Sequence, residues 1–134
     1  MSNKVLFITD TYKDLNIKKD TSILMIEEAI KRKFDVFQCE IDDLFIDDGY
    51  VYASSRNILS AGSTQVEGII KQDIKVSEFK YSFMRKDPPV DENYNNALHL
   101  LGLAEQQGAI IFNKPNSIKE FNEKIFALYF KRYI

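Results

Sequence analysis

The chain has 134 residues, of which 45% are hydrophobic and 28% are charged, a composition typical of one folded, soluble domain and not of a disordered or fibrous protein. Its formal net charge of −2, from 18 basic and 20 acidic residues, gives no electrostatic basis for binding nucleic acid or an anionic membrane. No apolar run is long enough to span a membrane or to form a signal peptide, so we expect a cytoplasmic protein.

The beginning of the sequence predicts a strand, a helix and a second strand. The β-branched and aromatic run at 4–9 predicts a buried strand. Asp20 or Thr21 is expected to cap a helix that ends near Lys33, and a second strand is predicted at 35–40. This order is typical of a parallel crossover unit.

The pattern then changes to that of a hairpin. Two short apolar runs, 44–46 and 50–52, flank the Asp-Asp-Gly sequence at 47–49, which predicts a tight turn. We expect a small antiparallel hairpin that projects from the body of the domain. Between residues 57 and 80 the periodicity is weak, and no element is predicted with its bounds.

A third strand and a second helix are predicted next. The apolar run at 81–84 must end at Arg85, because the prolines at 88–89 prevent it from continuing. Asp91 is expected to cap a helix that runs to about Gln107 and stops at Gly108. The predicted apolar face of this helix consists of Tyr94, Ala97, Leu98, Leu101 and Ala104.

The last part of the chain predicts a buried strand at 109–112, a turn at 113–116 and a helix opened by a capping box of Ser117 and Glu120. Strands that alternate with helices predict an α/β fold. We expect a mostly parallel, Rossmann-like open sheet with helices on both faces and one small β-hairpin, in a single domain of residues 1–134.

The topology predicts a binding site. In open parallel sheets ligands bind outside the carboxyl ends of the strands, and polar loops follow three such ends, at 10–20, 85–89 and 113–116. A cluster of cations at one edge suits a small anionic ligand, although each could also be a solvated loop charge. The cations in question are Lys18, Lys19, Arg85, Lys86 and Lys114.

Arg85 is the strongest single candidate. It follows an apolar strand directly, and the prolines at 88–89 hold its backbone. Its planar guanidinium can bind a carboxylate through two parallel hydrogen bonds, and the alternative is a salt bridge with Asp87 or with another acidic residue at the edge of the domain. We expect Lys19, Arg85 and Asn113 to lie at the same edge of the sheet.

Other chemistry has less support. The sequence lacks the glycine-rich dinucleotide and P-loop motifs and the common zinc motifs. His99, the only histidine, is expected on the surface of its helix, and Cys39, the only cysteine, is expected to be a small buried core residue and not a nucleophile. We therefore assign no catalytic, cofactor-binding or metal-binding residue to this chain.

Three motifs, in this order, carry a family resemblance over nearly the whole chain. They are Asn16-Ile17-Lys18-Lys19-Asp20-Thr21-Ser22, Met84-Arg85-Lys86-Asp87-Pro88-Pro89, and Asn113-Lys114-Pro115 followed by Asn122-Glu123-Lys124. Together they resemble the amino-terminal, pre-ATP-grasp domain of bacterial-type glutathione synthetases. The match is poor at 57–79, and Thr11 stands where the family commonly has proline.

The resemblance implies that Lys19 and Arg85 line a pocket for γ-glutamylcysteine or glutathione, with Asp20 and Asp87 as weaker candidates that brace these cations. It also implies that the intact protein is an ATP-dependent, magnesium-dependent ligase that joins γ-glutamylcysteine to glycine and is a homo-oligomer. The ATP-grasp portion would follow this chain, so we expect no ligase activity and no cofactor in the chain alone. The alternative hypothesis is a free-standing, non-catalytic α/β module that binds a small anion or a protein partner.

Overall fold

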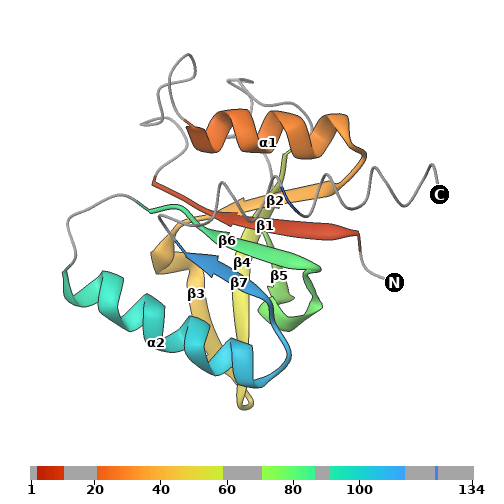
Figure 1. Ribbon diagram of the computed structural model, residues 1–134. Helices are drawn as coiled ribbons and strands as arrows, with labels where there is room; N and C mark the ends of the chain where they lie inside the picture. The colour runs from red at the N-terminus through yellow and green to blue at the C-terminus, as the bar shows by residue number, and fades with distance from the viewer. Residues whose placement is uncertain (1–2, 11–20, 59–70, 87–90, 114–122, 124–134) are drawn as a thin grey trace.

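A mixed sheet lies between two helices in the computed structural model (Figure 1), which describes residues 3–10, 21–58, 71–86, 91–113 and 123. The described elements are β1 (Lys4–Ile8), α1 (Thr21–Lys31), β2 (Asp35–Cys39), β3 (Leu44–Asp47), β4 (Tyr50–Asn57), β5 (Gln72–Lys75), β6 (Tyr81–Met84), α2 (Glu92–Gln106) and β7 (Ile111–Asn113), with short 3₁₀ turns at Ile41–Asp43 and Val76–Glu78. In this part of the chain the strand order is β3-β4-β2-β1-β6-β7, and β5 pairs with β4. The predicted α/β fold is confirmed.

The parallel part of the sheet is built around β1. This strand pairs in parallel with β2 on one side and with β6 on the other, and β6 pairs in parallel with β7. Leu6, Phe7 and Ile8 have no exposed surface, as expected for a strand that has neighbours on both edges and a helix on each face.

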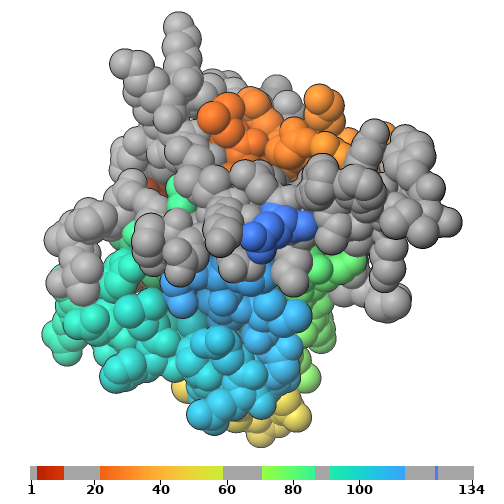
Figure 2. All heavy atoms as spheres, viewed as in Figure 1, coloured from red at the N-terminus to blue at the C-terminus, as the bar shows by residue number. Residues whose placement is uncertain are grey.

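Alternation along the strands divides the core into two layers. The layer on the α1 side contains Val5, Phe7, Ile23, Met25, Ile26, Ala29, Val36, Ile58 and Phe83. The layer on the α2 side includes Leu6, Ile8, Phe37, Cys39, Met84, Ala97, Leu101 and Ala104. Figure 2 shows the two helices at opposite sides of the molecule. The prediction of helices on both faces is therefore confirmed.

Aromatic rings stabilise the α1 layer across neighbouring strands. Phe7 stacks on Phe83 with ring centroids 5.1 Å apart, and Phe83 stacks on Phe112 at 5.3 Å. Such pairs contribute about 0.5–1.5 kcal/mol beyond their buried area. The stack links β1, β6 and β7 in the register that places their carboxyl ends side by side.

The helix ends follow the sequence signals. Asp91 caps α2 by accepting a hydrogen bond from the Tyr94 backbone N–H at 2.9 Å, and Gly108 after the helix has φ 105°. Helix α1 ends at Lys31, earlier than predicted, because Lys33 turns into the left-handed region with φ 71°. The buried face of α2 is formed by Ala97, Leu101 and Ala104, as predicted.

The predicted hairpin is present as β3 and β4, with Asp48 at φ 51° and Gly49 at φ 82° in the turn. The sequence did not indicate that the hairpin is also held by the end of α2. Gln107 donates from Nε2 to the Gly49 carbonyl at 2.7 Å and accepts from the Val51 N–H at 3.2 Å. The turn is exposed, but the hairpin is fastened to the end of α2, and Figure 2 shows it emerging beside that helix.

Two further differences concern strands. No element was predicted for residues 72–75, which form β5, because only Ile74 of these four residues is buried. The strand predicted as buried at 109–112 is β7, Ile111–Asn113, and neither Ile111 nor Phe112 is fully buried. In the described part of the sheet β7 has one neighbouring strand, so its residues are covered less than those of β1. The helix predicted from Ser117 lies outside the described residues.

None of the described helices is long and apolar enough to cross a membrane.

Gln107→Ala is expected to lower the free energy of unfolding by about 1–2 kcal/mol, because it removes two hydrogen bonds and leaves the Val51 N–H without its acceptor. Urea denaturation measures the change. The matched control is Gln106→Ala, an exposed residue of the same type one position earlier, which should change stability by less than about 0.5 kcal/mol. Equal effects of the two substitutions would contradict this role of Gln107.

Candidate functional site at the carboxyl edge of the sheet

Four parallel strands, β1, β2, β6 and β7, end at one level. Ile8 of β1 is in register with Cys39 of β2 and with Met84 of β6, and Met84 is in register with Asn113 of β7. Arg85, the next residue after β6, continues this pairing because its N–H donates to the Ile8 carbonyl at 2.7 Å. Arg85 and Asn113 therefore lie at the same edge, as predicted.

The other predicted substrate residues cannot be placed in the same way. Lys19, Asp20 and Asp87 lie outside the described residues, as do Lys18 and Lys114. Their roles stay predictions.

The Arg85 side chain is buried, with 6% of its surface exposed. Its Nε donates a hydrogen bond to the Ser22 hydroxyl at 3.1 Å, which links the end of β6 to the first turn of α1. Strand alternation places Arg85 on the same face as Phe83, under α1. Burying a cation is costly unless polar groups compensate it. Arg85 is therefore not a solvated loop charge, and its guanidinium is held by polar contacts within the protein.

Lys86 has a different environment from Arg85. Its Nζ forms an ion pair with Asp10 Oδ1 at 2.6 Å, and both side chains keep part of their surface exposed. This pair joins the residues that follow β6 and β1. The predicted cation cluster assumed that Lys86 contributes its full positive charge to this edge. Because Asp10 is paired with Lys86, the contribution of Lys86 to the positive potential is smaller.

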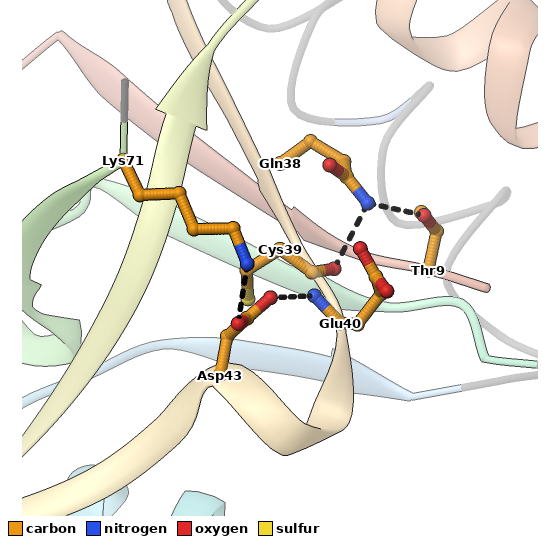
Figure 3. A network of polar contacts seen from close by, with 6 residues as sticks. All are labelled: Thr9, Gln38, Cys39, Glu40, Asp43 and Lys71. Carbon is orange, nitrogen blue, oxygen red and sulfur yellow. Dashed lines mark hydrogen bonds and ion pairs between the residues drawn. The ribbon is translucent and has the colours of Figure 1, made fainter. Parts of the chain in front are cut away.

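Buried polar groups also meet at the ends of β1 and β2 (Figure 3). The Thr9 hydroxyl donates to the Asp10 carbonyl at 2.7 Å and accepts from Gln38 Nε2 at 3.0 Å. Gln38 Nε2 also donates to the Cys39 carbonyl at 3.2 Å, while Gln38 Oε1 has no hydrogen-bond partner. Thr9 and Gln38 have no exposed surface, so this pair mainly braces the edge.

A second polar group holds the turn that follows β2. Asp43 accepts a hydrogen bond from the Glu40 N–H at 2.9 Å through Oδ2 and pairs with Lys71 Nζ at 2.6 Å through Oδ1 (Figure 3). These contacts join the end of β2 to the residue before β5. They fix the path of the chain and pair the positive charge of Lys71 with Asp43.

Cysteine and histidine are residue types that often take part in catalysis, and the chain has one of each, Cys39 and His99. Cys39 is fully buried, and burial first, then the negative charges of Asp43 and Glu40, raise the pKa of its thiol well above the usual value. His99 is exposed on α2. The predicted positions of both residues, Cys39 in the core and His99 on the surface of its helix, are confirmed. Among the described residues no group of three or more histidine, cysteine or acidic side chains is arranged to hold a metal ion.

Comparison with known proteins identifies the family. Residues 3–119 match the family described as "Prokaryotic glutathione synthetase, N-terminal domain". The chain therefore belongs to this family. It is 35% identical over 132 residues to a protein named glutathione synthetase from Buchnera aphidicola subsp. Schizaphis graminum, and 37% identical over 129 residues to one from Vibrio parahaemolyticus. These alignments cover 97% and 95% of this chain but 41% of each relative, so the chain spans about two fifths of their length.

Sequence reasoning found Arg85 but missed the residues that hold it. Ser22 lies within the first of the three motifs, yet nothing in its spacing indicated that its hydroxyl reaches β6. Thr9 could have been found from alternation, because a polar residue two positions after Phe7 must share its buried face. Gln38 shares the face of Val36 for the same reason.

The shifted pKa of Cys39 predicts low reactivity. Because burial favours the neutral thiol, we expect the folded chain to react with iodoacetamide at pH 8 at least about 100-fold more slowly than the urea-unfolded chain. Labelling rates followed by mass spectrometry measure this. Fast labelling of the folded chain would mean that Cys39 is accessible.

The same shift affects stability at alkaline pH. A folded-state pKa above the unfolded value of about 8.5 means that stability is fully present below that pH and falls as pH rises above it, where only the unfolded thiol ionises. The stability of the wild type relative to Cys39→Ala should therefore decline between about pH 8.5 and pH 10, since other titrating groups cancel in the difference.

Proposed function

We propose that residues 1–134 form the substrate-binding, pre-ATP-grasp domain of a glutathione synthetase, in which Arg85 binds a carboxylate of γ-glutamylcysteine. The observation that carries the proposal is the position of Arg85, a buried arginine at the carboxyl edge of a parallel sheet, held through Nε by Ser22. Ligands bind at this edge in open α/β sheets, and an oriented guanidinium is suited to a carboxylate. Family membership supports this function over that of a free-standing module.

Lys19, Asp20 and Asp87 complete the proposed site. Lys19 would add a second cation for a substrate that carries two carboxylates, and the two acids would orient the cations. In the proposed reaction ATP transfers its γ-phosphoryl group to the cysteinyl carboxylate, which gives an acyl phosphate and ADP. Attack by the glycine amine then forms the amide and releases phosphate. Magnesium would offset the phosphate charges, and we assign no contact with ATP or magnesium to the described residues.

The role of this domain in that reaction is to bind and orient. A guanidinium that holds a substrate carboxylate remote from the reacting carbonyl makes the same contact before and during phosphorylation. Such a contact stabilises the ground state and the transition state equally, so it acts on substrate affinity and not on the chemical step. The buried setting of Arg85 strengthens the contact because little water competes with the carboxylate.

The chain alone is expected to have no ligase activity and to bind MgATP more weakly than about 100 μM, which corresponds to about −5.5 kcal/mol. The reason is that the sequence contains no phosphate-binding loop. Calorimetric titration of the chain with MgATP measures this. Tighter binding would reveal a nucleotide site in this domain.

Arg85→Ala, made in a full-length protein that contains this chain, is expected to raise the KM for γ-glutamylcysteine more than it lowers kcat. Loss of a desolvated, charge-assisted pair costs about 2–5 kcal/mol, which is roughly 30-fold to several thousand-fold in kcat/KM. Arg85→Lys should restore part of the loss, because it keeps the charge but not the fork. Steady-state kinetics with each substrate varied in turn measure the effects.

The matched control is Arg32→Ala, which removes the same charge from an exposed arginine paired with Glu28 just past the far end of α1. It should leave the KM for γ-glutamylcysteine unchanged, and the KM for ATP should change little in any of the three variants. A selective loss of ATP affinity in Arg85→Ala, or an unchanged KM for γ-glutamylcysteine, would remove Arg85 from the proposed site.

A further inference from the structure

Ser22 and Arg85 meet although 63 residues separate them in the chain. Ser22 belongs to the first turn of α1, is 3% exposed, and accepts a hydrogen bond from Arg85 Nε at 3.1 Å. Arg85 is itself tied to β1 through its backbone N–H. The arginine is therefore held at both ends, by the sheet at its backbone and by α1 at its guanidinium.

The contact with Ser22 restrains the guanidinium, because a hydrogen bond at Nε holds the plane of this group relative to the first turn of α1. The same contact restrains rotation of the last side-chain torsions, which lowers the entropy lost when a ligand binds.

We propose that Ser22 is a positioning residue for carboxylate recognition, which acts by fixing the plane of the Arg85 guanidinium. This inference rests on the proposed function of Arg85. It adds that the first turn of α1 and the end of β6 form one recognition unit, in which a neutral hydroxyl sets the orientation and the arginine supplies the charge.

The buried serine on β6 provides a matched control. Ser82 is 1% exposed, lies three residues before Arg85, and its hydroxyl has no hydrogen-bond partner. It is in register with Leu6, and strand alternation therefore turns it toward the α2 layer, away from Ser22. Ser82→Ala removes the same atom as Ser22→Ala from a buried site that does not contact the guanidinium.

The first test is kinetic and uses a full-length protein that contains this chain. Ser22→Ala is expected to raise the KM for γ-glutamylcysteine by about 5- to 50-fold with little change in kcat, since it removes one hydrogen bond to a charged group. Ser82→Ala should leave both constants unchanged. Ser22→Cys, which keeps nearly the same shape but offers a weak acceptor, should behave like Ser22→Ala, and Ser22→Thr should recover much of the affinity.

The second test separates positioning from a merely structural role. Lysine lacks the Nε–H group that donates to Ser22 in the wild type. The effect of Ser22→Ala should therefore largely disappear when it is combined with Arg85→Lys. Calorimetric binding of γ-glutamylcysteine to the four proteins of this double-mutant cycle gives the coupling. Additive effects, or equal effects of Ser22→Ala and Ser82→Ala, would overturn the inference while leaving the proposed function in place. An unchanged KM in Arg85→Ala would instead remove the proposed function, and the inference with it.

Discussion

The parallel pairing of β1 with β2 and β6 is the constraint on which the rest of the structure depends. It places the ends of these three strands at one level. Because β1 has a neighbouring strand on each edge, Leu6, Phe7 and Ile8 are completely buried. A shift of one residue would turn each of these side chains to the opposite layer and would separate Arg85 from α1. Core packing and the candidate site are thus consequences of the same register.

Polar contacts at the carboxyl edge have two different purposes. The Thr9–Gln38 pair and the Asp43–Lys71 pair join the ends of strands to the turns that follow, and their atoms are directed at other groups of the chain. The contact between Arg85 and Ser22 has another purpose, because it joins the end of β6 to the first turn of α1 and restrains the buried guanidinium at Nε.

The sequence predicted most of the fold because its local signals agree with its tertiary contacts. Asp91, Gly108 and the Asp48-Gly49 turn have the conformations that their residue types favour, and the apolar periodicity of α2 matches its buried face. Prediction failed where a segment has few buried residues, as in β5, or where distant contacts decide the outcome, as with Gln107 and the hairpin. The strand at 109–112 was predicted as buried because its composition is apolar, but composition does not show how many neighbours a strand has.

By itself, the sequence determined the class of fold, the strand after which Arg85 comes, and the family, because these depend on local periodicity, on turn residues and on contiguous motifs. Only the tertiary structure decided that Arg85 is buried, that Ser22 holds its Nε, and that Asp10 neutralises Lys86. The physical reason is that a hydrogen bond or an ion pair between residues far apart in the chain depends on strand register and on how a helix lies against the sheet. Neither the register nor the helix packing can be derived from the spacing of residues along one segment.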